Sequence, residues 1–174
     1  MKVIVLLDQI QAGLGGKEKA DTPLGGKKLA MGAADTLDKV FRKHGSEVIG
    51  TFYCGTEYYQ QNKEVVQRKV VKMAEKMQAD VVVAGPTYDY PEFSTMACEL
   101  ALKVQQKTTI PVVPMVAIEK NQALIEQYRE SLTIVKMPKK GGTGLSDAID
   151  HMVELCQLKA KNQDITDFVK QYCY

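Results

Sequence analysis

The chain has 174 residues, of which 45% are hydrophobic and 25% charged, and its formal net charge is +2. This composition is typical of a folded globular protein with its own core. The small net charge does not indicate a nucleic-acid partner or an anionic membrane. No apolar run approaches the ~20 residues that span a bilayer, so a membrane protein is also not expected.

The cysteines do not form a metal-binding pattern. They stand at positions 54, 98, 156 and 173, without a C-x-x-C pair, and only two histidines accompany them. We therefore expect no metal or other cofactor and reduced thiols. Met1 and Lys2 lead directly into an apolar run rather than a signal peptide, which predicts a cytoplasmic location.

Five short apolar runs predict β-strands that are buried on both faces. They cover residues 3–7, 48–53, 81–84, 110–116 and 132–135, and Pro114 suggests an end or an edge in the fourth run. Helical patterns at 29–41, 57–77, 93–104, 119–129 and 145–156 alternate with these runs. The alternation predicts an α/β fold, a three-layer α/β sandwich with a mostly parallel, doubly wound sheet of about five strands. We expect one domain over residues 1–163 and a helical tail over 164–174.

Two connections are rich in glycine. Residues 9–26 are about twice as long as a usual strand-to-helix loop and contain Gly13, Gly15 and Gly16. They lack the G-x-G-x-x-G pattern, so we expect a functional or mobile loop rather than a dinucleotide fingerprint. Residues 137–144 contain Gly141 and Gly142 after two lysines, which is consistent either with a carboxylate or phosphate cradle or with a solvated turn.

In a parallel sheet the loops that leave the strands meet at one rim, where ligands bind. This rule predicts one cavity for a small amine- or carboxylate-bearing ligand. Its expected substrate-binding residues are Gly13, Gly15, Gly16, Gly85, Pro86, Thr87, Tyr88, Met115, Glu119, Gly141 and Gly142. Cys54 ends the second strand and is the best-placed thiol for catalysis, although a lone cysteine is more often inert. The alternative for the 85–90 loop is a capped turn whose tyrosines only cover the core.

Several motifs occur in the order found in a known family. The chain has AGLGGKEKAD at 12–21, YCGTEYY at 53–59, AGP at 84–86, AC at 97–98 and IPVV at 110–113. A G-G-x-G segment then leads into the last long helical pattern. This ordered set resembles the amino-terminal half of component B of glycine, sarcosine and betaine reductases, over about residues 3–160.

The resemblance implies a part in the reductive cleavage of a C–N bond. In that family a selenocysteine attacks the α-carbon of the substrate, the amine leaves, and the carboxymethyl group passes to a small selenoprotein. The selenocysteine lies in a carboxyl-terminal region that has no counterpart in this sequence. The resemblance therefore implies a subunit or stand-alone relative that supplies the binding pocket, with a selenoprotein or thioredoxin-type redox partner, in a homo-oligomer or hetero-complex. The alternatives are a non-catalytic binding or regulatory module, or a thiol enzyme that uses Cys54.

Overall fold

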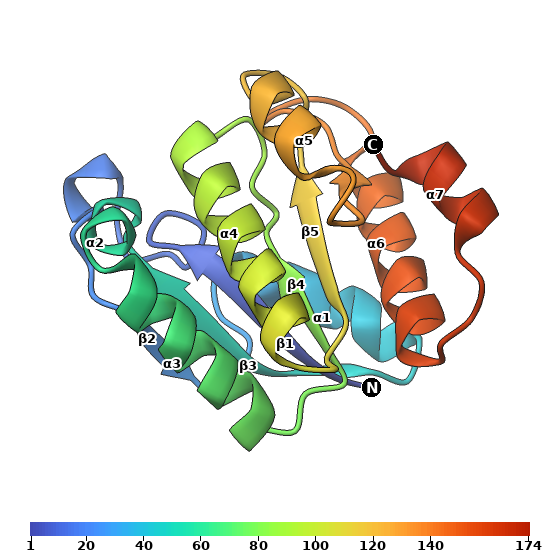
Figure 1. Cartoon of the computed structure of the whole chain (residues 1–174), viewed down its shortest axis with the longest axis horizontal. Helices are drawn as coiled ribbons and strands as arrows, with labels where there is room; N and C mark the ends of the chain where they lie inside the picture. The colour runs from blue at the N-terminus through green and yellow to red at the C-terminus, as the bar shows by residue number, and fades with distance from the viewer.

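The computed structural model describes residues 1–174 and contains one six-stranded sheet with the strand order β2-β3-β1-β4-β5-β6 (Figure 1). The strands are β1 (Lys2–Asp8), β2 (Gly25–Lys27), β3 (Glu47–Cys54), β4 (Val81–Ala84), β5 (Val112–Val116) and β6 (Val135–Lys136). All neighbouring pairs are parallel except β2 and β3. Without β2, the order 2-1-3-4-5 is that of the flavodoxin-like doubly wound sheet. The predicted fold class is confirmed.

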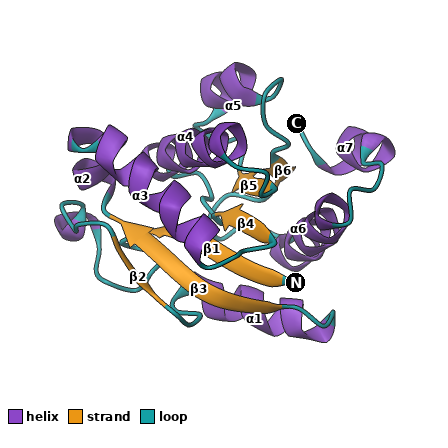
Figure 2. Cartoon of the chain, turned by 60° about the horizontal axis from the view of Figure 1, so that its bottom comes forward, coloured by secondary structure: helices purple, strands orange, loops and turns teal.

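Helices cover both faces of the sheet, which makes the three layers (Figure 2). The helices α2 (Thr56–Gln61), α3 (Lys63–Lys76) and α4 (Pro91–Lys107) lie on one face. On the other face, α1 (Ala33–Lys43) packs beside α6 (Leu145–Ala160). The short α5 (Gln122–Tyr128) packs against α4, between β5 and β6 in the chain.

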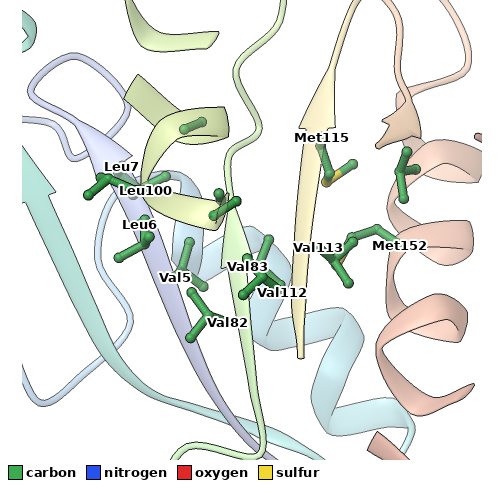
Figure 3. Packing of buried hydrophobic residues seen from close by; sticks show 14 of the residues in the cluster. Val5, Leu6, Leu7, Val82, Val83, Leu100, Val112, Val113, Met115 and Met152 are labelled. Carbon is green, nitrogen blue, oxygen red and sulfur yellow. The ribbon is translucent and has the colours of Figure 1, made fainter. Parts of the chain in front are cut away.

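The central strands are buried on both faces, as their continuous apolar sequences require. Every residue of β4 is buried, and so is every residue of β1 except Lys2. Figure 3 shows the valines and leucines of β1, β4 and β5 between Leu100 of α4 and Met152 of α6. The core therefore consists of two apolar layers, one on each side of the sheet, and it fixes where the strands end.

The strand β2 was not expected from the sequence. It has only three residues, two of them glycine, and it pairs antiparallel with β3 inside the long glycine-rich connection. Glycine disfavours strands, so no pattern marked it. The last predicted strand is shorter than expected, because only Val135 and Lys136 pair with β5. Pro114 of β5 pairs with Ala84 of β4, whereas the pairing of β5 with β6 begins only at Met115. Pro114 therefore lies on a local edge of the sheet, where a proline is tolerated.

Two helix predictions need correction. The first helix begins at Ala33 rather than near residue 29, and the side chain of Leu29 is 51% exposed instead of facing the core. The pattern over residues 57–77 is two helices, because the chain turns at Asn62 between α2 and α3. Both errors arise where the apolar spacing continues through a turn, and spacing alone does not reveal a turn.

The carboxyl-terminal segment contains α7 (Thr166–Tyr172). The ring of Tyr172 stacks on His151 of α6 with 3.7 Å between the ring centroids. Phe168, also on α7, is buried with its ring edge-on to the same histidine. Cys173 then forms an antiparallel bridge with Val135 of β6. The expected helical tail is present and packs on the core, and the division of the chain at residue 163 stays a prediction.

Candidate functional site

The sheet has a topological switch point between β1 and β4. These strands are neighbours, with Leu6 opposite Ala84, but the chain leaves β1 towards α1 and leaves β4 towards α4, which lie on opposite faces. Divergent loops at the carboxyl ends of two adjacent strands open a crevice, where ligands bind in sheets of this class. Two cavities flank this part of the rim, one on each face of the sheet.

The larger cavity, the rim cavity, has a volume of about 670 Å³ and lies on the face of α2 and α4. It collects residues from the exits of β1, β3, β4 and β5, and from the 3-10 turn Lys17–Lys19. Its lining residues are Asp8, Gln9, Ile10, Lys17, Ala20, Thr56, Glu57, Gln60, Tyr90, Pro91, Glu92, Phe93 and Lys120. The cavity thus brings together carboxylates, ammonium groups and two aromatic rings.

Asp8 is the most unusual of these side chains. It is the last residue of the central strand β1 and is only 2% exposed. Its Oδ1 accepts a hydrogen bond from the backbone N–H of Gln11 at 2.7 Å. Burial nevertheless raises the pKa of the Asp8 carboxyl to about 6, because desolvation disfavours the charged form. A buried carboxylate in a crevice is a candidate partner for a cationic group.

Gln9 connects two segments of the rim cavity wall through side-chain hydrogen bonds. Its side chain is 2% exposed, its Oε1 accepts from the backbone N–H of Thr56 at 3.3 Å, and its Nε2 donates to the carbonyl of Gly16 at 3.5 Å. The backbone N–H groups of Glu57 and Tyr58 donate to the carbonyl of Ala20. These contacts join the glycine-rich connection to the start of α2 and so position both beside Asp8.

Lysines supply the positive charge of the rim cavity. The Nζ atom of Lys120 lies 3.1 Å from Oδ2 of Asp89, while Oδ1 of Asp89 accepts from the backbone N–H of Lys140 at 2.9 Å. These hydrogen bonds, that from Lys140 first, lower the pKa of the Asp89 carboxyl. Asp89 therefore ties the loops after β4, β5 and β6 together and places Lys120 at the cavity. Lys17 enters the lining from the 3-10 turn and has no ion-pair partner within the chain.

A smaller cavity of about 320 Å³ lies on the face of α1 and α6. Pro86 and Tyr88 line it, together with Gln11, Thr36 and Lys140. The Nζ atom of Lys140 lies 4.6 Å from the centre of the Tyr88 ring, which is a cation–π contact. Tyr88 is 7% exposed, so its ring forms part of the wall between the rim and the core.

Thr87 and Gly85 occupy the interior of the β4 exit loop. Thr87 is fully buried, its Oγ1 donates to the carbonyl of Met115 at 2.9 Å, and it accepts from Oγ of Ser94 at the same distance. Gly85 has φ +126°, and a Cβ there would lie 2.9 Å from the amide nitrogen of Thr87. Met115 is itself fully buried. Thr87 and Met115 therefore point into the core and join β4 to β5, rather than facing either cavity.

The structure buries Cys54 at the end of β3. The side chain is 2% exposed, and desolvation raises the pKa of the thiol to about 12. A reactive thiolate needs exposure and nearby positive charge, and neither is present at Cys54. The other three cysteines are buried as well. A catalytic role for Cys54 stays a prediction that this environment does not favour.

The remaining predicted residues lie on the outer part of the rim. Gly13, Gly15, Glu119 and Gly141 are exposed, while Gly16 and Gly142 are half-buried. None of the six lines either of the two cavities. Of the other named residues, Pro86 and Tyr88 line the smaller cavity, while Thr87 and Met115 pack inwards. Their roles in binding a substrate stay predictions.

Sequence reasoning missed several residues that line the rim cavity, above all Asp8, Gln9 and Lys120. One signal for Asp8 was present, because KVIVLLD places an acid directly after a fully apolar strand. No group of three histidine, cysteine or acidic side chains is arranged to hold a metal ion. No helix is both long and apolar enough to cross a membrane.

The fold and the charged cavity at the switch point define a doubly wound α/β domain with a candidate small-ligand site. The chain belongs to the family described as glycine/sarcosine/betaine reductase selenoprotein B, which matches residues 1–173. It is 30% identical, over 94% of its length, to the glycine reductase complex component B subunit gamma of Carboxydothermus hydrogenoformans. It is 26% identical, also over 94%, to the sarcosine reductase complex component B subunit beta of Peptoclostridium acidaminophilum.

The chain is shorter than these relatives. The matched regions cover 37% of the glycine reductase subunit and 36% of the sarcosine reductase subunit. A betaine reductase complex component B subunit beta of Peptoclostridium acidaminophilum is 28% identical over 118 residues, or 26% of its length. No solved structure gives a significant match.

Proposed function

We propose that the chain is the substrate-side subunit of a reductase of the glycine/sarcosine/betaine type and works in the cytoplasm. In this proposal it binds a small zwitterion, such as glycine, sarcosine or betaine, in the rim cavity. The proposal rests on one observation: the buried carboxyl of Asp8 and the ammonium groups of Lys17 and Lys120 line the same cavity. The names of the relatives, which are subunits of glycine, sarcosine and betaine reductase complexes, support it.

The charges of the cavity match the two ends of such a ligand. An ammonium or quaternary amine next to Asp8 would stabilise the carboxylate form, which burial disfavours in the free protein. The ligand carboxylate would face Lys120 or Lys17 at the exposed side of the cavity. The rings of Tyr90 and Phe93 also line the cavity and suit a methylated amine, since cations bind aromatic faces.

Chemistry on the bound substrate would come from another polypeptide. Reductive cleavage needs a soft nucleophile of low pKa and a reductant that regenerates it. All four thiols of this chain are buried, and none stands in a C-x-x-C pair. A selenoprotein or thioredoxin-type partner would therefore supply the redox residue in a hetero-complex.

The test measures binding and turnover separately. Calorimetry with glycine, sarcosine and betaine is expected to show saturable binding that Lys120→Gln weakens, while the exposed Lys107→Gln at the end of α4 leaves it unchanged. Incubation of the purified chain with dithiothreitol and each substrate is expected to release no ammonia from glycine, no methylamine from sarcosine and no trimethylamine from betaine. Release should begin when a co-encoded redox partner is added. Multiple turnovers by the chain alone that disappear in Cys54→Ser would instead identify a complete thiol enzyme.

The burial of all four cysteines also favours a second candidate, a binding or regulatory module without catalysis. It predicts the same ligand binding and the same effect of Lys120→Gln. It differs in turnover, because no amine would be released even in the presence of the partner. The partner experiment therefore separates the two candidates.

A further inference from the structure

A third cavity lies at the edge of the sheet, away from the rim. It has a volume of about 570 Å³ and shares no lining residue with the rim cavity. Its floor is formed by Ile49 and Phe52 of β3 and by Met73 and Met77 at the end of α3. Figures 1 and 2 show α3 running beside β3 and β2 at this end of the sheet. We call this hollow the edge pocket.

The edge pocket is open because β2 brings almost no side chains to it. A Cβ at Gly26 would lie 2.6 Å from Cδ1 of Phe52, so the Phe52 ring packs directly against the β2 backbone and is only 4% exposed, while Met73 and Met77 are half-buried. A Cβ at Gly50 would lie 2.8 Å from Cε of Met77, so the methionine side chain lies directly over β3. Methionine adapts its shape to what it contacts, which suits a binding surface. The floor is thus apolar and deformable.

Four lysines surround this floor: Lys2, Lys27, Lys28 and Lys76. All four are exposed, and none of them forms an ion pair within the chain. No acidic residue lines the pocket.

Two acids lie near Lys2 without lining the edge pocket. Glu47 lies 3.6 Å from Arg42, and Oδ2 of Asp80 accepts a hydrogen bond from the backbone N–H of Lys2. In a protein of net charge +2, a group of four unpaired ammonium groups around an apolar floor is a local excess of positive charge.

We propose that the edge pocket binds a small amphiphile with an anionic head, a carboxylate or a phosphate, and an apolar body. The apolar body would cover the half-buried Met73 and Met77 and remove them from water. The head would reach the ammonium groups of the surrounding lysines, whose charge-assisted hydrogen bonds to an anion are stronger than neutral ones. The pocket lies within the usual size range of small-molecule sites. This inference is independent of the substrate proposed for the rim cavity.

The experiment uses two anionic probes, decanoate and decyl phosphate, which show whether the pocket prefers a carboxylate or a phosphate head group. Decanol has the same chain without charge, and decyltrimethylammonium has the opposite charge. The methyl groups of ¹³C-labelled Met73 and Met77 report binding directly by NMR. We expect both methyl signals to shift saturably with at least one anionic probe. That probe should bind at least about tenfold more tightly than decanol, since one charge-assisted hydrogen bond is worth that factor.

Variants test the charge and the floor separately. Lys27→Glu/Lys28→Glu should weaken binding of the anionic probe at least about tenfold, because it replaces two attractive charges with repulsive ones. The control Lys107→Glu/Lys161→Glu makes the same change in net charge at exposed sites outside the pocket and should leave the affinity unchanged. Met73→Gln should weaken the binding of decanoate and decanol alike.

Three outcomes would overturn the proposal. The first is equal or tighter binding of decyltrimethylammonium. The second is the absence of saturable shifts of the Met73 and Met77 methyl groups with either anion. The third is a change of these signals on dilution of the protein alone, which would assign the surface to a contact with a second copy of the chain.

Discussion

The carboxyl of Asp8 and the backbone N–H of Gln11 form a 2.7 Å hydrogen bond at the end of the central strand. This bond closes the first turn after β1 and fixes one carboxyl oxygen. It does not compensate for burial, since the pKa of Asp8 remains raised to about 6. Asp8 is therefore a carboxylate whose burial costs stability at the switch point, and we propose that it is compensated when a cationic group binds.

We predict that Asp8→Asn makes the protein more stable at pH 7.5 while removing ligand binding. The asparagine Oδ1 can keep the hydrogen bond from Gln11 but carries no charge to desolvate. A pKa near 6 against an ordinary value of 3.8 corresponds to about 3 kcal/mol, an upper bound on the gain at neutral pH. Urea unfolding of both proteins measures the difference.

The pH dependence of this difference has a definite sign. Between pH 3.8 and about 6 the native Asp8 keeps its proton while the unfolded chain loses it, so native stability falls as pH rises. The advantage of Asp8→Asn should be absent below pH 3.8, grow through this window, and be constant above it. The exposed Asp150→Asn on α6 serves as the control. A variant that is less stable than the parent at every pH would contradict the assignment.

We predict that Tyr59→Phe destabilises the protein by about 1–3 kcal/mol. The fully buried Tyr59 donates to Oε2 of Glu99 at 2.7 Å and accepts from Nε2 of Gln67 at 2.8 Å, which joins α2 and α3 to α4. Tyr58→Phe is the matched control, because its hydroxyl has no hydrogen bond within the chain. Urea denaturation compares the two, and equal effects would rule out the proposed role of the Tyr59 network.

Thr87 and Ser94 should be energetically coupled. Oγ of Ser94 donates to Oγ1 of Thr87, which donates in turn to the carbonyl of Met115. We expect Thr87→Val and Ser94→Ala each to cost about 1–2 kcal/mol, and the double variant to cost less than their sum. A double-mutant cycle in urea measures the coupling. Strict additivity would mean that the three groups do not act as one network.

Cys54 should resist alkylation in the native protein. Its thiol is buried and its pKa is raised to about 12, so almost no thiolate is present at pH 8. We expect iodoacetamide to modify Cys54 slowly in buffer and rapidly in urea, as read by mass spectrometry of the peptide. Fast modification in buffer of Cys54, and of no other cysteine, would instead support Cys54 as a nucleophile.

The central part of the fold follows from the sequence because its signals are strong. The run VVVA of β4 and the run VIVLL within β1 contain no polar residue, and such short runs rich in valine are typical of strands buried on both faces. The edges were predicted less well. The short β2 contains two glycines and pairs through its backbone, so its place depends on β3 rather than on its own residues.

The candidate site could be predicted only as a location. The crevice rule points to the carboxyl ends of the strands, where the two cavities lie, but it does not say towards which face each loop turns. Thr87 illustrates the difference, since a hydroxyl in an exit loop suggests ligand binding but here bonds to Met115 in the core. Asp8 is the opposite case: the sequence shows an acid directly after an apolar run, but the burial that raises its pKa depends on elements distant in the sequence.

Ligand binding in the rim cavity is tested most directly by an NMR titration of the ¹⁵N-labelled chain with glycine, sarcosine and betaine. We predict saturable shifts for at least one of them in the backbone amides of residues 8–10, 56–60 and 90–93, the segments that line the rim cavity. Asp8→Asn should remove these shifts while the rest of the spectrum stays native. Saturable shifts confined to other surfaces, or none with all three molecules, would contradict this prediction.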